Sequence, residues 1–199
     1  GNSATVLNSS FEVDSDSDGV PDNWTVNLYP GGSQTLDTAS PAHGAQTLKF
    51  THPGGSGNGG GYATSDYIEI DAMSRRLVKW LHKSTAAGMH NKIEVKYYDE
   101  DKLYLSTDSL YDSTSNPTVD TESVRSFYPP GTARYIKLLV YGGISDTDVA
   151  GSAYFDRFVI ELDLPAYEPG TYVIASSDSE NFSTNDWWTK LKEIKVKRR

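Results

Sequence analysis

Residues 91–99 read Asn91-Lys92-Ile93-Glu94-Val95-Lys96-Tyr97-Tyr98-Asp99, and their side chains alternate in polarity along the chain. In an extended chain the more apolar side chains share one face, namely Ile93, Val95 and Tyr97. A period of two is typical of a strand with one face in the core. Residues 134–141 repeat the period, with large side chains on both faces. Both segments predict β-strands.

Further segments rich in β-branched and aromatic residues lie on both sides of this pair, and none of the chain shows a convincing helical pattern. The predicted strands are 5–8, 24–29, 46–52, 67–70, 76–83, 103–106, 122–127 and 153–162. Clusters of Gly, Pro, Asn, Asp and Ser separate them. About ten short strands with such turns predict an all-β protein, a two-sheet antiparallel β-sandwich of the jelly-roll type.

The composition excludes several classes of protein. The chain has 199 residues, no Cys, and 18 Lys+Arg against 27 Asp+Glu, a formal net charge of -9. Because nucleic acid is a polyanion, we expect no nucleic-acid partner. Without Cys there is no disulfide framework, thiolate zinc site or thiol nucleophile. No stretch approaches the roughly 20 apolar residues of a membrane span, so we expect no membrane insertion.

The pattern changes near residues 164–170, which read Leu-Pro-Ala-Tyr-Glu-Pro-Gly. Pro and Gly in such a run are typical of a module boundary. We therefore predict a β-sandwich over 1–165 and a linker with a basic C-terminal segment over 166–199. Residues 189–199 carry six Lys/Arg and one Glu. Their alternation fits the first strand of a next module, and a disordered basic end fits as well.

An acidic segment has the spacing of a calcium loop: Asp14-Ser15-Asp16-Ser17-Asp18-Gly19-Val20-Pro21-Asp22. Carboxylates at alternate positions can surround one hard cation, and the glycine permits the sharp turn. The predicted ligands are the carboxylates of Asp14, Asp16, Asp18 and Asp22 and the carbonyl of Val20. Thr25 stands where an EF-hand has its bidentate Glu, so another ligand or water would complete the shell. The alternative is a solvated acidic turn.

Catalytic signals are weak. The four histidines, His43, His52, His82 and His90, show no metal-ligand spacing, so structural roles are expected. No Gly-x-Ser-x-Gly turn is present, and no pair of the 27 acids stands out as a glycosidase pair. The glycine-rich run at 54–61 lacks the Lys-Ser/Thr ending of a phosphate loop, which favours a flexible loop. We expect no enzyme activity.

Aromatic residues make up 12% of the chain and offer flat apolar faces suited to sugar rings. By strand period Trp24, Tyr97, Phe155 and Phe158 fit the core. The period sends Tyr98, Tyr104, Tyr135 and Tyr141 to the opposite faces of their strands. Trp80 shares a face with Val78, and either orientation of that strand is possible. The candidate ligand-binding residues are Trp80, Tyr98 and Tyr141, and for each a core role is the alternative.

Several motifs resemble bacterial or phage carbohydrate-binding modules of the galactose-binding-like jelly-roll type. They are Val6-Leu7-Asn8-Ser9-Ser10-Phe11-Glu12, Val20-Pro21-Asp22-Asn23-Trp24, Lys92 to Asp99, Tyr135-Ile136-Lys137-Leu138 and Tyr154-Phe155-Asp156-Arg157-Phe158-Val159-Ile160. The resemblance covers about residues 4–163. It implies a structural calcium ion between Glu12 and Asp156, although Arg157 stands where a second acidic residue is frequent. Residues 172–199 resemble segments of phage tail and bacterial surface proteins.

The resemblance implies a non-catalytic module that binds a polysaccharide or cell-surface glycan with Ca²⁺ as cofactor. It implies an extracellular or virion location, such as a phage tail, with a bacterial surface possible, and neighbouring modules in the same chain. The alternative is a structural or adhesion spacer of a phage tail or bacterial surface protein without its own glycan site. Clustered outward aromatics would favour the first reading and scattered ones the second.

Overall fold

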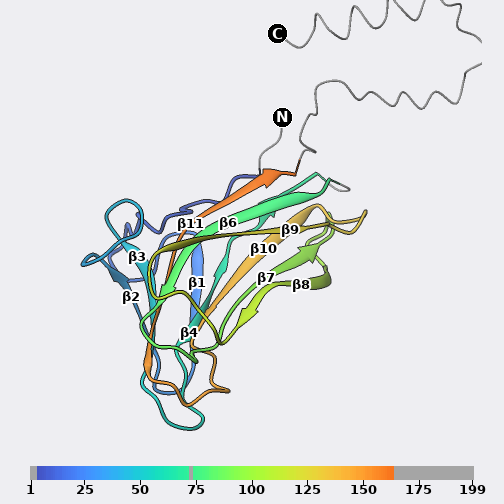
Figure 1. The fold of residues 1–199 in the computed structure, drawn as a ribbon. Coiled ribbons are helices and arrows are strands. Elements are labelled where there is room, and N and C mark those ends of the chain that lie inside the picture. The colour runs from blue at the N-terminus through green and yellow to red at the C-terminus, as the bar shows by residue number, and fades with distance from the viewer. Residues whose placement is uncertain (1–3, 72–73, 164–199) are drawn as a thin grey trace, which may run out of the picture. The chain divides into compact units, whose positions relative to one another are not determined.

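A computed structural model describes residues 4–71 and 74–163 of the chain. In this part the chain forms eleven strands in two antiparallel sheets packed face to face, which confirms the predicted β-sandwich (Figure 1). Among the same residues no helix is long and apolar enough to cross a membrane. The predicted segment 166–199 lies outside the described residues.

The first sheet, sheet A, has the two most regular segments of the sequence at its centre. Its strand order is β1 (Trp24–Leu28), β4 (Gly61–Ser65), β10 (Tyr135–Gly142), β7 (Asn91–Tyr98) and β8 (Tyr104–Ser113), and β5 (Ile68–Glu69) pairs with β10. All of its pairings are antiparallel.

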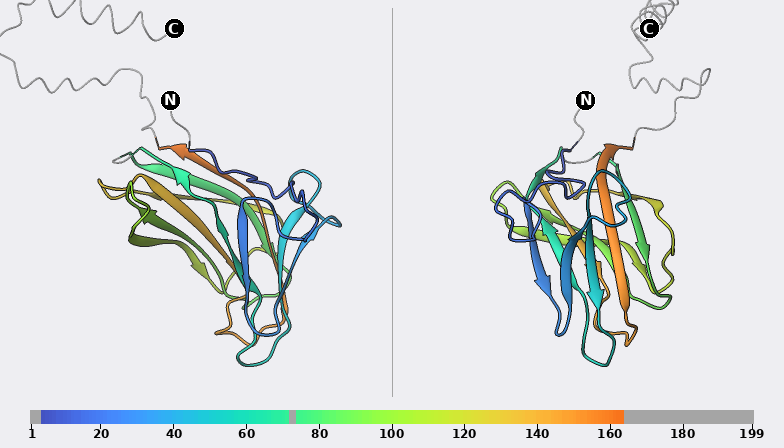
Figure 2. Two further views of the ribbon diagram at one scale, coloured as in Figure 1. Left: turned by 180° about the vertical axis from the view of Figure 1, so that it is seen from behind. Right: turned by 90° about the vertical axis from the view of Figure 1, so that its left-hand side faces the viewer.

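The second sheet, sheet B, covers the inner face of sheet A (Figure 2). Its order is β2 (Ser33–Asp37), β3 (Thr47–His52), β11 (Gly151–Leu162), β6 (Arg76–Ser84) and β9 (Thr121–Phe127). Strand β6 has a strict alternation, with every second residue from Arg76 to Ser84 buried. The core lies between the inner faces of the two sheets.

Aromatic rings fill one part of the core. Phe158 stacks on Trp80 with ring centroids 6.3 Å apart and planes inclined by 7°, and it also contacts Trp24 at 5.9 Å and Phe11 at 6.1 Å. All four rings are at most 5% exposed. The core roles predicted for Trp24, Phe158, Tyr97 and Phe155 are confirmed.

The strand predictions were wrong in three places. Residues 5–8 form no strand, because the chain turns at 7–10. Strand β2 was missed, since its residues are mostly polar and it lies at a sheet edge. Strand β4 was missed because it begins inside the glycine run: Gly60 packs against Gly142 so closely that a Cβ would meet the Gly142 carbonyl. The run therefore ends in packed backbone and is not a loop throughout.

A histidine in the core makes stability depend on pH. His82 is 2% exposed, and burial followed by the charge of Arg125 lowers its pKa to about 4. The folded state therefore stays unprotonated at His82 while the unfolded state takes up a proton below its ordinary pKa of 6.5. We expect stability to fall as the pH drops from about 6.5 to 4, by up to roughly 3 kcal/mol from this group.

Urea unfolding of the protein and of His82→Gln between pH 7 and pH 4.5 measures this effect. The difference between the two proteins isolates the contribution of His82, because all other titrating groups are shared. Parallel pH profiles for the two proteins would contradict it.

Candidate functional site

The outer face of sheet A carries an unusual number of tyrosines. On β10 the inner positions Ile136, Leu138 and Val140 are buried, so the alternate positions Tyr135, Lys137, Leu139 and Tyr141 point outward. Leu139 is only 3% exposed although it is not part of the core cluster. This leucine lies between an aromatic end and a lysine-rich end of the face.

At the first end three tyrosines form an aromatic group, Tyr29, Tyr62 and Tyr141. Tyr62 and Tyr141 face each other across β4 and β10, with ring centroids 5.1 Å apart, and Tyr29 lies 6.1 Å from Tyr62. All three are partly exposed. They present adjoining aromatic surface over two neighbouring strands and the turn after β1.

Charged groups on the next strand hold this aromatic group in place. The Tyr141 hydroxyl donates to Glu94 Oε2 at 3.0 Å, and Lys92 Nζ lies 2.6 Å from Glu94 Oε1. Burial, followed by the Glu94 charge and hydrogen bond, raises the pKa of Tyr141, so the hydroxyl stays a donor. Glu94 therefore binds both the Tyr141 hydroxyl and the Lys92 ammonium group and holds them next to each other.

His90, the residue directly before β7, binds two further carboxylates. His90 Nε2 lies 2.6 Å from Asp112 Oδ1, and His90 Nδ1 lies 2.7 Å from Asp146 Oδ2. Burial lowers the pKa of His90, but the bonds to Asp112 and Asp146 outweigh it and the pKa is raised. A charged imidazolium can donate to both carboxylates at once. His90 therefore joins β8 to the loop before β11.

The second end combines tyrosines with lysines. Tyr135, Tyr98 and Tyr104 are opposite one another across β10, β7 and β8, and Tyr67 lies 5.0 Å from Tyr98 and 6.0 Å from Tyr135. Lys137 Nζ lies 4.2 Å from the centre of the Tyr67 ring. Lys102 Nζ lies 4.9 Å from the Tyr67 ring and 5.3 Å from the Tyr135 ring. Ammonium groups thus cover aromatic faces at this end.

The structure separates the three aromatic candidates. Tyr98 and Tyr141 lie on the outer face, at opposite ends of it, and both are partly exposed. Trp80 is 0% exposed, so the prediction that it contacts ligand is wrong. The physical reason is the register of β6, in which the face that carries Val78, Trp80 and His82 turns into the core.

Sequence reasoning missed Tyr62, Tyr29 and the polar partners Lys92 and Glu94 as site residues. Tyr62 lies in the strand hidden by the glycine run, and Tyr29 follows β1 in a turn. The alternation of 91–99 does place Lys92 and Glu94 on the same face as Tyr98, which is the signal that could have found them.

The acidic loop brings three of its carboxylates together. Ligand oxygens of Asp14, Asp16 and Asp18 lie within 4.8 Å of one another, and Asp14 Oδ1 is buried without a hydrogen-bond partner. Asp22 lies outside this cluster, because its two oxygens accept hydrogen bonds from the Ser15 N–H at 3.1 Å and the Ser15 hydroxyl at 2.8 Å. Val20 donates its N–H to Asp18 Oδ1 at 2.7 Å.

A second acidic pair lies where β11 bulges. The register of β11 shifts between Asp156 and Val159, Arg157 has a φ of 51°, and Asp156 turns inward to 1% exposure. Its Oδ2 accepts the His43 N–H at 2.8 Å, while Oδ1 is buried without a partner. Burial chiefly, with a smaller contribution from the charge of Glu12, raises the pKa of Asp156 to about 7, although backbone hydrogen bonds such as that from His43 act to lower it.

Glu12 is the other carboxylate of this pair, and backbone N–H groups hold it in place near Asp156. Its Oε2 accepts the Ala45 N–H at 2.9 Å and its Oε1 the Gln46 N–H at 3.4 Å. Gly44, with a φ of 69°, allows the close approach, since a Cβ there would overlap the Glu12 carboxylate. Two carboxylates with an unpartnered buried oxygen form a donor set that suits a hard cation such as Ca²⁺.

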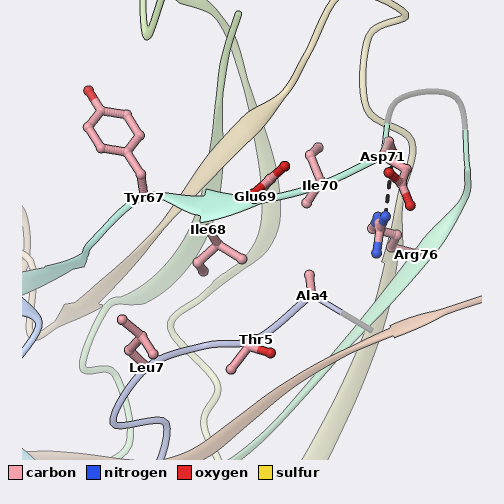
Figure 3. A pocket seen from close by; sticks show the side chains of 9 residues that line it. All are labelled: Ala4, Thr5, Leu7, Tyr67, Ile68, Glu69, Ile70, Asp71 and Arg76. Atoms are coloured by element: carbon pink, nitrogen blue, oxygen red, sulfur yellow. Dashed lines mark hydrogen bonds between the residues drawn. The ribbon is translucent and has the colours of Figure 1, made fainter. Parts of the chain in front are cut away.

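A cavity of about 450 Å³ lies between the N-terminal segment and β5 (Figure 3). Ala4, Thr5, Leu7, Ile68 and Ile70 line it beside polar groups. Arg76, which is fully buried, donates to the Asp71 carbonyl at 3.4 Å. Tyr67 also lines the cavity, and in Figure 3 its ring and the Ile68 side chain point to opposite sides of the strand.

Comparison with known proteins places the fold. No protein-family model matches the sequence, and no curated protein matches it. Among solved structures, the CBM22-1 xylan-binding domain of Paenibacillus barcinonensis Xyn10C has a TM-score of 0.50 and 17% identity, over 81% of this chain and 97% of that one. The chain has the fold of a jelly-roll carbohydrate-binding module. This confirms the predicted fold class.

Two longer proteins contain the same fold. The Clostridium thermocellum xylanase 10B CBM22-1–GH10 structure, complexed with xylohexaose, has a TM-score of 0.54 and 18% identity over 84% of this chain. Tailspike protein 4 of bacteriophage CBA120 has a TM-score of 0.54 and 15% identity over 80% of this chain. The chain spans 30% and 21% of their lengths, respectively.

Proposed function

We propose that the chain is a non-catalytic carbohydrate-binding module that binds a polysaccharide across the outer face of sheet A. The observation that carries this proposal is the aromatic group of Tyr29, Tyr62 and Tyr141, which is partly exposed and bordered by Glu94 and Lys92. The fold shared with xylan-binding domains supports it.

The geometry suits a sugar ring. Tyrosine faces cover the apolar C–H side of a pyranose at a low cost in side-chain entropy, while neighbouring charged groups bond its hydroxyls. Glu94 is an acceptor and Lys92 a donor beside the Tyr141 ring. Tyrosines lie at both ends of this face, across β4, β10 and β7, so a chain of several sugars can extend from one end to the other. Clustered outward tyrosines favour this function over that of a spacer without a glycan site.

Affinity for a single site is expected to be modest. A dissociation constant near 1 mM corresponds to about -4 kcal/mol, which a few aromatic and hydrogen-bond contacts supply. Repetition of sites along a fibre or coat raises the effective affinity by avidity.

Substitution of the tyrosine pair tests the site. We expect Tyr62→Ala and Tyr141→Ala each to weaken binding by about tenfold, because each removes one stacking surface. Affinity gels and calorimetry with a panel of soluble polysaccharides, xylan included, measure the effect. Tyr154→Ala is the matched control, since Tyr154 is a partly exposed tyrosine on β11 of sheet B, between Lys49 and Lys83. Binding that Tyr154→Ala weakens and Tyr141→Ala leaves intact would place the site on the other sheet.

We propose Ca²⁺ as the structural cofactor. Glu12 and Asp156 would hold one ion, and Asp14, Asp16 and Asp18 a second, with the Val20 carbonyl as a further ligand and Asp22 bracing the loop through Ser15. The unpartnered buried oxygens of Asp156 and Asp14 support both positions. The ion would neutralise carboxylates that otherwise repel one another and would tie the N-terminal segment to β11.

The module is proposed to act within a larger extracellular or phage tail protein. The xylanase and tailspike structures with this fold are several times longer than the matched part, which supports such a context. Residues 166–199 would then lead toward a neighbouring module.

A further inference from the structure

We propose that the glycan bound on the outer face of sheet A is acidic, and that Lys96, Lys102 and Lys137 bind its carboxylate or sulfate groups. The inference rests on the proposed function, because it names the substrate class of that same face.

The first observation is the pairing of the lysines. Among the residues that the structure describes, Lys49, Lys79, Lys83 and Lys92 each have a carboxylate oxygen within 4.0 Å. The remaining lysines of the described ranges have none, and they are Lys96, Lys102 and Lys137. In a chain with a net charge of -9 the unpaired ammonium groups of residues 4–71 and 74–163 are thus gathered at one end of one face.

The second observation is that two of these lysines are direct neighbours. Lys137 and Lys96 are opposite each other on β10 and β7, in the row beside Tyr135 and Tyr98. Like charges at directly opposed positions destabilise a sheet. Both side chains are partly buried on the face, which strengthens their repulsion relative to open solvent. A bound anion between them would remove this cost.

The two ends of the face differ in what they can bind. Lys137 lies over the Tyr67 ring, and Lys102 lies over the Tyr67 and Tyr135 rings, so cations occupy positions that a sugar ring would need for stacking. The Tyr62 and Tyr141 rings have no ammonium group over them among the described residues. The end with Tyr62 and Tyr141 therefore stacks a sugar ring, and the lysine end binds a charged substituent further along the glycan.

No carboxylate oxygen of the described residues lies within 4.0 Å of these three lysines, although Glu100 and Asp101 directly precede Lys102 in the sequence. Glu94 is taken by Lys92 and Tyr141, and Asp99 Oδ1 accepts the N–H groups of Asp101 and Leu103. Glu69 lies opposite Tyr135 on β5 and is exposed, outside ion-pair distance of the three lysines. Removal of the Glu69 charge should therefore strengthen the binding of an acidic glycan, whereas removal of a lysine charge should weaken it.

The experiment measures binding of the full chain to matched pairs of polymers by affinity gel and calorimetry at low salt. Glucuronoxylan and its carboxyl-reduced form test a carboxylate, and chondroitin sulfate and its desulfated form test a sulfate. We expect the acidic member of a pair to bind about tenfold more tightly, with the preference lost in 1 M NaCl because salt screens exposed charges.

The variants place the effect on this face. Lys96→Gln/Lys137→Gln is expected to remove the preference for the acidic polymer and to leave the affinity for its neutral partner within about twofold. Glu69→Gln is expected to increase the preference. Lys49→Gln/Lys79→Gln is the matched control, since it removes two charges from sheet B, and it should change neither affinity.

The outcomes separate this inference from the proposed function. Neutral polymers that bind as tightly as acidic ones, through Tyr62 and Tyr141, would overturn the acidic specificity and keep the glycan site. An equal loss of affinity for the acidic polymer in Lys96→Gln/Lys137→Gln and in Lys49→Gln/Lys79→Gln would show unspecific attraction to polyanions and overturn the acidic specificity. Binding of single-stranded DNA as tight as that of the acidic polymer would do the same. Failure of every polymer to bind would overturn both.

Discussion

Replacing Trp80 with alanine is expected to lower the free energy of unfolding by about 3–5 kcal/mol, which is the usual cost of removing a large aromatic side chain from a packed core. Trp80 is fully buried, stacks on Phe158 at 6.3 Å and contacts Tyr111 at 5.9 Å and His82 at 5.8 Å. The backbone of β6 is paired on both sides, so the sheet cannot move in to fill the space.

Urea or thermal unfolding followed by circular dichroism measures this loss. Trp80→Phe keeps part of the ring volume and should cost less, so that the folded variant can be assayed for binding. Since Trp80 does not reach the surface, we expect the folded Trp80→Phe protein to bind glycan as the wild type does. A folded variant with unchanged stability and no binding would contradict the buried position.

Asp156→Asn is expected to have opposite effects with and without calcium. In chelator at pH 8 the wild type holds a buried carboxylate with one unpartnered oxygen, and its pKa of about 7, raised from the ordinary value of 3.8, corresponds to a cost of about 4 kcal/mol. The neutral amide avoids the charge and still accepts the His43 N–H. Because an unpartnered amide N–H₂ takes the place of Oδ1, we expect a net gain of about 2 kcal/mol.

The sign of the pH dependence follows from the same shift. In chelator, the folded state binds the proton of Asp156 more tightly than the unfolded state does, so this group makes the protein less stable as the pH rises from about 4 to 7. The asparagine variant should lack this dependence.

In millimolar calcium the order is expected to reverse. A bound ion stabilises the wild type by RT ln(1 + [L]/Kd), which is about 2.7 kcal/mol at a hundredfold excess over Kd. Asp156→Asn should lose most of that gain. Asp16→Asn is the comparison, since it affects only the loop cluster and should keep the Asp156 behaviour. Equal melting temperatures in calcium and chelator, together with no calcium binding by calorimetry, would contradict the proposed site.

Local patterns predicted the parts of the fold in which each residue's environment alternates regularly. Strands β7 and β10 follow directly from the period of residues 91–99 and 134–141, and the outward positions of Tyr98 and Tyr141 follow from the same period. Strand β4 could not be predicted this way, because its first residue belongs to a glycine run that has no side-chain pattern.

The site depends on pairing between strands far apart in the sequence. Tyr62 meets Tyr141 only through the register of β4 and β10, and the lysine row exists only because β7 and β10 pair with Lys96 opposite Lys137. No local pattern contains such a register. The same holds for Asp156, which a bulge turns inward toward Glu12.

The sequence by itself determined the all-β class, the acidic charge, the central strands and the spacing of the Asp14–Asp22 loop, because alternation and spacing are local properties of the chain. Only the tertiary structure decided that Trp80 is core, that Tyr62 and Tyr29 join Tyr141, and that Lys96, Lys102 and Lys137 lie at one end of a face without an ion pair to a described carboxylate. These depend on strand order and register, which follow from how the two sheets bury their apolar faces together.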